Sequence, residues 1–292
     1  MVNGDDMINN FSLEGWKLFS DRRNSTNYIS EDGKWLLKIF GDSTDLHSIA
    51  ELEKERQKNL DVATLGINVP KVGEIVHLED GRYGMTYEYI QGKKSFSRAI
   101  SEEPENVEKY AAGFAEMALE LHSTPCNTEL FKPVEYIISE TVKSCDWLSP
   151  ENRAKIARLL DRTEKRTTCL HMDFQPGNFV FAPSGRYYID LGMMVYGNPL
   201  YDLGVFYFMS HYWPEQAIRE IFKTDRETLL ETWKYFVKHY FNIDVQNQAE
   251  FDRINDMIKP YAAPGFLSHG YYLDEAPGAA DIILAAIDEC MD

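Results

Sequence analysis

The chain lacks the long apolar run and the leader that would tie it to a membrane or a secretory route. No stretch approaches the roughly 18 uncharged apolar residues of a membrane-spanning helix. Residues 1–10 are polar and acidic, without the basic and then apolar segments of a secretory signal. We therefore expect a cytoplasmic protein with no membrane partner.

Cysteine is scarce and irregularly placed. The four cysteines are Cys126, Cys145, Cys169 and Cys290, and no two share the short spacing of a metal or disulfide motif. This pattern favours reduced, buried thiols over a disulfide framework or a structural zinc site.

Positive charge is also in deficit. The 30 Lys and Arg residues face 47 Asp and Glu residues, so that the formal net charge is −17. Phosphate groups would be repelled by such a surface, which excludes nucleic acid as the main partner. The acidic excess is compatible with a cationic small substrate, although a charged, solubilising surface is the more common reason for it.

Apolar residues, by contrast, are sufficient for a substantial core. Hydrophobic residues make up 44% of the 292 residues and aromatic residues 13%. This length exceeds the size at which a single core usually stops growing, so two packed units are expected. No internal repeat is visible, which predicts that the two units differ in structure.

The first 92 residues predict a small antiparallel sheet interrupted by one helix. Short apolar segments bounded by turn residues predict strands at 16–19, 27–29, 35–40, 72–78 and 83–89. Between them, the apolar spacing from Leu46 to Leu60 predicts a helix over residues 44–60. Gly92 marks the expected domain boundary, with residues 88–92 as the hinge.

Residues 93–292 predict a larger, mainly helical domain. Stripes of apolar residues at helical spacing, bounded by residues that end helices, predict helices at 107–121, 134–143, 150–162, 214–241 and 274–288. One short strand-rich segment lies between Cys169 and Ile189. The expected fold class is therefore α+β, with a sheet lobe followed by a helical lobe.

The strand-rich segment carries the residues with the clearest chemistry. The run from His171 to Asn178 places Asp173 and Asn178 five positions apart, in a loop that Pro176 and Gly177 keep from being helical. The residues that follow read as a strand, a turn at 182–185 and a returning strand. Closure of this hairpin would bring Asn178 beside Asp190.

Phosphoryl transfer requires such a juxtaposition. Mg2+ takes oxygen ligands, and one or two protein oxygens together with nucleotide phosphates complete its shell, so we predict that Asn178 and Asp190 bind Mg2+. Asp173 can then accept the proton of an incoming hydroxyl and orient it, as a catalytic base. We predict an enzyme that uses ATP and Mg2+ to phosphorylate a small hydroxyl-bearing substrate.

The loop from His171 to Asn178, followed by residues 189–192 with the sequence Ile-Asp-Leu-Gly, is similar to the paired motifs of protein-kinase-like phosphotransferases. It most resembles the aminoglycoside phosphotransferase and choline kinase family. The resemblance implies a protein-kinase-like two-lobed fold. A further acidic residue of that family corresponds to Asp202, which would support the catalytic loop. His171 is expected to be a buried scaffold residue without a chemical role.

A kinase also needs a cation on the nucleotide phosphates, and Lys38 lies within the apolar strand at 35–40. Its expected anionic partner is Glu55, three residues after Leu52 on the inward stripe of the helix, with Glu51 as the alternative. The resemblance favours Glu55. An edge-strand lysine that discourages aggregation is the other interpretation of Lys38.

The loop at residues 20–26 contains no glycine, unlike the glycine-rich loop of protein kinases. The resemblance tolerates this difference and implies that Ser25 and Thr26 contact phosphate through hydroxyls or backbone amides. It also implies that the backbone around Glu88 and Ile90, just before Gly92, binds the edge of the adenine.

The acceptor is less well defined by the sequence. Aromatic residues gather late in the chain, at Tyr212, Trp213, Trp233, Tyr235, Tyr261, Phe266, Tyr271 and Tyr272. Together with Asp274 and Glu275 they would suit a cation such as a choline-like molecule, an amino sugar or an aminoglycoside. For each single aromatic residue, ordinary core packing is the more common explanation.

Two other functions compete with a small-molecule kinase. A pseudokinase would bind nucleotide as a scaffold without turnover, and the intact set of Lys38, Asp173, Asn178 and Asp190 argues against it. A divalent-metal hydrolase built on His171 ranks last, because no other histidine cluster of ligand spacing is near. Both a monomer and a homodimer fit the sequence.

Overall fold

The computed structural model describes residues 10–22, 25–40, 49–269 and 278–291. The chain divides into two compact units, of which the first comprises Met1–Lys93 and Phe181–Gly192 and the second the remainder. A boundary drawn at residue 92 from sequence alone leaves out the return of residues 181–192 to the first unit. Residues 181–192 are held to the first unit by contacts between residues that are far apart in the sequence. Asn68 Nδ2 donates to the carbonyl of Arg186 at 2.7 Å, and Tyr188 N donates to the carbonyl of Asn68 at 3.0 Å.

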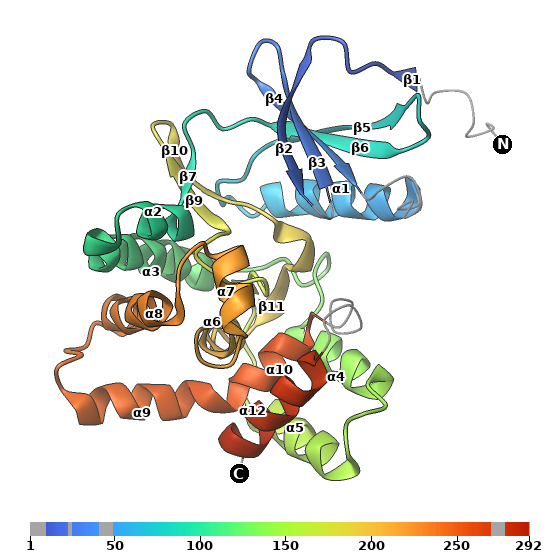
Figure 1. Cartoon of the computed structure of the whole chain (residues 1–292). Helices are drawn as coiled ribbons and strands as arrows, with labels where there is room; N and C mark the ends of the chain where they lie inside the picture. Colours follow the sequence, from blue (N-terminus) through green and yellow to red (C-terminus); the bar gives the residue numbers. More distant parts are fainter. Residues whose placement is uncertain (1–9, 23–24, 41–48, 270–277, 292) are drawn as a thin grey trace. The chain divides into compact units, whose positions relative to one another are not determined.

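The first unit is built on a six-stranded sheet with the order β1-β5-β6-β4-β3-β2. Its strands are β1 (Asn10–Phe11), β2 (Trp16–Arg22), β3 (Ser25–Ser30), β4 (Trp35–Phe40), β5 (Val72–Leu78) and β6 (Tyr83–Glu88). Neighbouring strands are antiparallel except that β1 joins β5 in parallel. Helix α1 (Ile49–Ala63) lies against β5 and β6 (Figure 1). It extends past the predicted end at residue 60, and residues 44–48 lie outside the described part.

The two faces of this sheet differ, and the difference places Lys38. Leu37 and Ile39 are fully buried and pack with Leu78 on one face. Because side chains alternate along a strand, Lys38 lies on the other face, where its cross-strand partner Met85 packs against Leu52 of α1. The helix-covered face of the sheet therefore carries the predicted nucleotide lysine.

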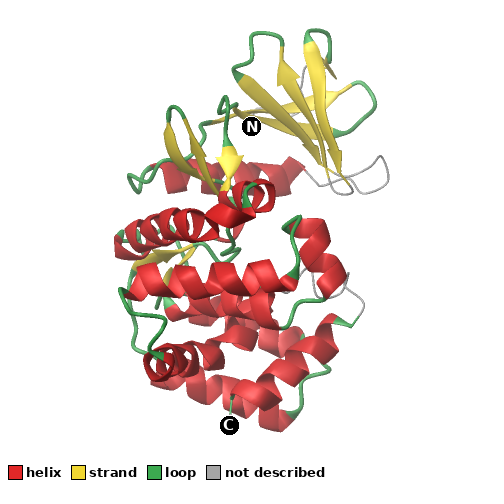
Figure 2. Cartoon of the chain, turned by 60° about the vertical axis from the view of Figure 1, so that its left-hand side comes forward, coloured by secondary structure: helices red, strands yellow, loops and turns green. Residues whose placement is uncertain are grey.

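The second unit is mainly helical (Figure 2). Its first part contains β7 (Lys94–Ser95), α2 (Phe96–Glu102), α3 (Val107–Ser123), α4 (Val134–Ser144), α5 (Pro150–Arg162) and β8 (Thr168–Leu170). Along the chain, the hairpin strands β9 (Phe179–Ala182) and β10 (Gly185–Tyr188) come next, and from Phe181 onward this hairpin belongs to the first unit. Strand β11 (Val195–Gly197), in the second unit, then pairs with β8. The last part contains α6 (Leu200–His211), α7 (Glu215–Ile221), α8 (Arg226–Phe241), α9 (Gln248–Ile258), α10 (Ala262–Leu267) and α12 (Ala279–Cys290). The predicted α+β organisation is confirmed.

Some helix predictions were wrong in detail. The helix expected over residues 214–241 is divided into α7 and α8, because Lys223 adopts a left-handed φ of 58° and Asp225 caps the start of α8 by accepting from Thr228 N at 2.9 Å. Helix α12 begins after Gly278, whose φ is 82°, and the part of the predicted helix at residues 274–277 lies outside the described residues. Helix α6 was not predicted, because Tyr201–Ser210 are all buried and show no polar face.

The sequence also led us to expect buried, reduced cysteines and no membrane-spanning helix. All four cysteines are buried and free. None of the helices in the described ranges combines the length and apolar character that a membrane span requires.

Two glycines allow α6 and α10 to pack with their backbones in close approach. A Cβ at Gly204 of α6 would overlap the backbone carbonyl of Tyr261, just before α10. A Cβ at Gly265 of α10 would lie 2.7 Å from the carbonyl oxygen of Tyr201. The contact positions α6, which carries Asp202.

We expect the Gly204→Ala variant to be less stable by about 1–3 kcal/mol, because the added methyl group forces two backbone segments apart. Urea denaturation of the variant and wild type measures the difference. Gly192→Ala is the control, because no atom lies within 4 Å of the Cβ position there. Equal stability of all three proteins would contradict the close approach.

Candidate active site

The predicted catalytic loop connects β8 to β9 in the second unit. Asn178 N donates to the carbonyl of Gln175 at 3.1 Å, and the carbonyl of Pro176 accepts from Ser97 N at 3.1 Å. Met172 has a left-handed φ of 65°, which is uncommon for a residue with a long side chain. Such strained conformations persist only where the surrounding contacts hold them, and they gather at functional sites.

Aromatic side chains pack this loop against the hydrophobic core of the second unit. Phe174 within the loop and Phe179 at its end are fully buried, with ring centroids 5.1 Å and 4.7 Å from that of Phe114 on α3. Phe206 and Phe236, from α6 and α8, complete the cluster around Phe114. The loop is therefore fixed to the core formed by three helices.

The Asp202 carboxylate holds the start of the loop. It is fully buried and accepts hydrogen bonds from the amides of His171 and Met172, each at 2.7 Å. His122 Nε2 lies 3.0 Å from the same carboxylate, and His122 Nδ1 lies 2.8 Å from the hydroxyl of Tyr240. The contact with the loop is of the kind that the resemblance implies for Asp202. The sequence did not indicate His122, which falls within the apolar stripe of α3.

Asp173, the predicted catalytic base, lies within this loop. Asn178 Nδ2 donates to its Oδ2 at 2.7 Å and to its backbone carbonyl at 2.9 Å, and His269 Nε2 lies 3.8 Å from its Oδ1. Burial acts to raise the pKa of the Asp173 carboxyl. The hydrogen bond and charge of His269, the charge of His171 and the Asn178 amide outweigh it, so that the pKa lies below its usual value. Asp173 is therefore ionised at neutral pH.

In the first unit, Lys38 and Asp190 form an ion pair. Lys38 Nζ lies 3.7 Å from Asp190 Oδ1, and the side chains are 28% and 58% exposed. Asp190 has a left-handed φ of 56°. Asn178 belongs to the second unit and Asp190 to the first, so their joint binding of a metal stays a prediction.

The predicted acidic partner of Lys38 lies on the inward side of α1. Tyr87 on β6 donates from its hydroxyl to Glu55 Oε1 at 3.0 Å, whereas Glu51 is exposed. Burial raises the pKa of Tyr87 well above its usual value, and the negative charges of Glu55 and Asp190 add to this shift. Tyr87 therefore stays a hydrogen-bond donor and fixes the position of the Glu55 carboxylate.

The other predicted nucleotide residues lie at the ends of strands. Ser25 begins β3, and Thr26 pairs with Ile39 of β4, while residues 23–24 of that loop lie outside the described part. Glu88 N donates to the carbonyl of Lys71 at 2.7 Å. Ile90 is buried, 3% exposed. Phosphate and adenine binding by these residues stay predictions.

Three of the aromatic residues proposed for the acceptor are buried in the core. Trp233, Tyr261 and Phe266 are each at most 9% exposed, and Trp233 Nε1 donates to Asn255 Oδ1 at 3.0 Å. Ordinary packing thus accounts for them. Tyr271, Tyr272, Asp274 and Glu275 lie outside the described residues.

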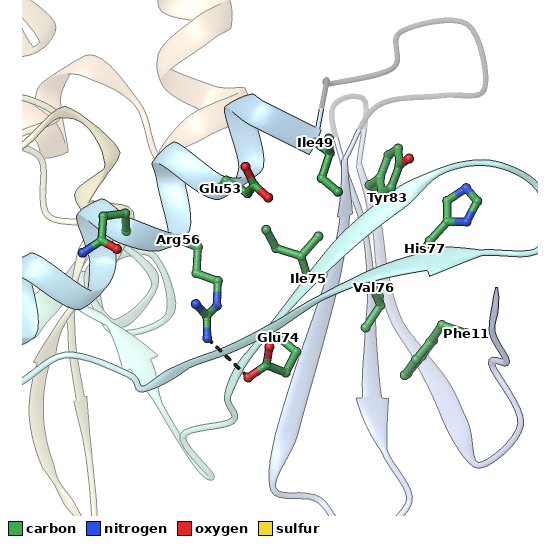
Figure 3. Close-up of a pocket in the computed structure, with 10 residues that line it drawn as sticks. Phe11, Ile49, Glu53, Arg56, Glu74, Ile75, Val76, His77 and Tyr83 are labelled. Carbon is green, nitrogen blue, oxygen red and sulfur yellow. Dashed lines mark hydrogen bonds and ion pairs between the residues drawn. The ribbon is translucent and has the colours of Figure 1, made fainter. Parts of the chain in front are cut away.

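A hollow of about 570 Å3 lies in the first unit, where α1 passes β5 and β6 (Figure 3). Arg56 crosses it to reach Glu74, with 3.3 Å between the guanidinium and the carboxylate, and His77 and Tyr83 line its far side. None of the predicted nucleotide residues lines this hollow. It is therefore not the predicted ATP site.

Taken together, the fold and the site define a protein-kinase-like phosphotransferase. The model of the phosphotransferase enzyme family matches residues 15–236, which include every catalytic, metal and nucleotide residue predicted from the sequence. The chain belongs to this family. The predicted kinship with aminoglycoside phosphotransferases and choline kinases is thereby confirmed, as is the class of small-molecule kinase.

Several solved structures share the fold. An amicoumacin kinase in complex with AMP-PNP and Ca2+ is 16% identical over 98% of this chain and 90% of its own, with a TM-score of 0.56. A thermostable mutant of an aminoglycoside phosphotransferase in complex with AMP-PNP and hygromycin B is 14% identical over 94% of this chain and 93% of its own, with a TM-score of 0.56. The GDP complex of aminoglycoside 2′-phosphotransferase-IIIa is 15% identical over 98% and 94%, with a TM-score of 0.51. No curated protein sequence matches the chain.

We expect Asp202→Asn to cost about 3 kcal/mol of stability or more, measured by urea denaturation. An asparagine has one acceptor oxygen in place of two, and its NH2 group would face a backbone N–H at one of the two loop contacts. Asp161→Asn on the exposed face of α5 is the matched control. A difference below about 0.5 kcal/mol between the two variants would show that Asp202 does not hold the loop.

Proposed function

We propose that the chain transfers the γ-phosphate of Mg-ATP to a hydroxyl of a small, cationic molecule. The observation that carries this proposal is the ionised Asp173 carboxylate, which Asn178 orients within a loop that Asp202 holds by two backbone hydrogen bonds. Positioning of the nucleophile supplies much of the rate gain in phosphoryl transfer. Asp173 accepts the hydroxyl proton and directs the oxygen toward phosphorus.

Asn178 and Asp190 are the proposed metal ligands. Because Asn178 Nδ2 is turned to Asp173, its Oδ1 is the atom that Asn178 offers to a cation. The carboxylate of Asp190, 58% exposed, offers a second oxygen. Oxygen donors of this kind fit Mg2+, which when bound neutralises charge on the nucleotide phosphates. No cluster of three or more His, Cys, Asp or Glu side chains that could hold a metal occurs among the residues described.

The nucleotide is bound by residues of the first unit. Lys38 contacts the α- and β-phosphates, and its ion pair with Asp190 keeps it beside the metal ligand. Glu55 provides the acidic counterpart on α1. Ser25 and Thr26 contact phosphate, and the backbone at Glu88 and Ile90 binds the adenine.

The acceptor class rests on weaker support. The net charge of −17 favours a cationic substrate, and the similar solved structures include a complex with hygromycin B. Their nucleotides are AMP-PNP and GDP, so ATP and GTP are both donors to test. Choline-like molecules, amino sugars and aminoglycosides are the acceptors of first choice.

We expect an acceptor panel with Mg-ATP or Mg-GTP to yield a phosphorylated product that depends on Asp173. Asp173→Ala should lower kcat by about 10^2 to 10^4, because the catalytic base is removed. The panel comprises choline, ethanolamine, amino sugars, aminoglycosides, neutral sugars and homoserine, with product followed by mass spectrometry. Asp161→Ala, on an exposed helix face, is the control. Nucleotide binding without any Asp173-dependent product would instead support a pseudokinase.

Separate roles for Asp173 and Asp190 predict different effects on nucleotide binding. Asp190→Ala should abolish turnover and weaken the binding of Mg-ATP, because a metal ligand is lost. Asp173→Ala should leave nucleotide affinity nearly unchanged, since this carboxylate faces the acceptor. Isothermal titration calorimetry with Mg-AMP-PNP compares the two. Equal loss of affinity in both variants would contradict the assignment.

A further inference from the structure

His122 lies in the last turn of α3, next to the carboxylate that holds the catalytic loop. Its side chain is 3% exposed, and its Nε2 lies 3.0 Å from Asp202 Oδ2. On the other side of the ring, Nδ1 lies 2.8 Å from the hydroxyl of Tyr240 on α8. The ring also stacks on Phe174 within the loop, with centroids 5.2 Å apart and planes at 26°. This buried imidazole thus links α3, α6, α8 and the loop.

The partners of His122 fix the direction of its ring. The two oxygens of Asp202 already accept from the amides of His171 and Met172, and a carboxylate oxygen that also accepts from a ring nitrogen requires a hydrogen on that nitrogen. Nε2 therefore donates to Asp202 whether the ring is neutral or protonated. Burial and the charge of Asp202 raise the pKa of Tyr240, so that its hydroxyl keeps its hydrogen beside Nδ1. With both nitrogens bound, the ring has one orientation.

The hydrogen bond from His122 differs in origin from the two amide bonds. The amides belong to the loop, so they fix the loop relative to the Asp202 carboxylate but not relative to the rest of the core. The last torsion of an aspartate side chain is soft, and the carboxylate could turn together with the loop. His122 and Tyr240 belong to α3 and α8, outside the loop. Their contacts hold the carboxylate, and through it the loop, in one position.

We propose that His122 is a positioning residue for phosphoryl transfer, which sets the orientation of Asp173 by fixing the carboxylate of Asp202. Asp173 comes directly after the two amides and directly before Phe174, so the contacts of His122 act on both sides of it. This inference rests on the proposed function, in which the orientation of Asp173 supplies much of the rate gain. His122 itself moves no proton in the reaction.

The first test is His122→Phe, which keeps a ring on Phe174 but removes the donor to Asp202. We expect kcat to fall by about 10- to 100-fold, the value of one hydrogen bond to a charged group. KM for Mg-ATP should stay within about twofold of wild type, because a positioning role acts on the chemical step and not on nucleotide binding. Rates are measured by mass spectrometry with the panel acceptor that the wild type uses best, and are expressed per folded enzyme from the stoichiometry of Mg-AMP-PNP binding.

Two further variants separate the donor from the ring. His122→Gln places an amide N–H donor near the position of Nε2 and should recover part of the lost kcat. Tyr240→Phe removes only the hydroxyl that orients the ring, and should lower kcat by about threefold, the value of one neutral hydrogen bond. It also serves as the test if His122→Phe fails to fold.

A matched control is His211→Phe on α6, the helix that carries Asp202. His211 also stacks on an aromatic ring, that of Tyr207 at 3.8 Å, and its Nδ1 lies 2.9 Å from the carbonyl oxygen of Tyr207. This variant loses a buried imidazole as His122→Phe does, but without a change at the loop. We expect it to keep the wild-type kcat per folded enzyme.

Hydrogen exchange gives a readout independent of turnover. The amides of His171 and Met172 should exchange at least about tenfold faster in His122→Phe than in wild type, relative to the core amides of α5, because the carboxylate that accepts from them is no longer held. His211→Phe should leave this ratio unchanged.

The outcomes separate this inference from the proposed function. If the wild-type protein gives no Asp173-dependent product with any acceptor, the proposed function fails and this role fails with it. Product formation with an unchanged kcat in His122→Phe, or with equal losses in His122→Phe and His122→Gln, would overturn only the role of His122. Unchanged exchange of the two amides in His122→Phe would overturn it as well.

Discussion

The candidate active site depends on one buried carboxylate. Asp202 is fully buried on α6 and accepts from two consecutive backbone amides, those of His171 and Met172. A buried charge is tolerable only when hydrogen bonds satisfy it, and here the bonds come from the loop that carries Asp173. The same two hydrogen bonds therefore satisfy the buried charge of Asp202 and fix the shape of the loop.

This arrangement explains how a strained loop can be part of a stable core. Met172 has a left-handed backbone, and the flanking Phe174 and Phe179 are fully buried. The packing of these rings on Phe114 prevents the loop from relaxing. The Asp202 carboxylate accepts hydrogen bonds from the two amides that the left-handed turn directs inward. Asp173 can then face outward, with 29% of its side chain exposed, while its charge is stabilised by Asn178 and His269.

In the first unit, contacts of the hairpin and of Tyr87 hold a second group of charged side chains in place. The hairpin that ends at Asp190 is tied to Asn68, and Asp190 lies 3.7 Å from Lys38. Tyr87, whose pKa is raised by burial and by Glu55 and Asp190, secures the acidic side of α1. A cation and two carboxylates are thus already assembled in the first unit, and such preorganisation would lower the cost of the nucleotide binding that we propose.

Much of this protein was determined by sequence patterns alone. The alternation that buries Leu37 and Ile39 places Lys38 on the opposite face, and Pro176 with Gly177 keeps Asp173 and Asn178 in a loop. Such local rules predicted the fold class, whereas the family was predicted from the resemblance of the His171–Asn178 loop and residues 189–192 to known phosphotransferase motifs. They failed for α6, which is buried on all sides and has no polar face to reveal its period. They failed also at α7 and α8, where a left-handed residue and a cap divide one apolar pattern.

Only the tertiary structure brought His122 to Asp202 and His269 to Asp173. These pairs join residues 80 and 96 positions apart (202 − 122 and 269 − 173), and a histidine within an apolar stripe carries no sign of its partner. Local sequence specifies backbone shape and the direction of side chains. Which polar groups meet is decided by how helices pack, because the need to satisfy a buried charge or acceptor arises only once packing has excluded water.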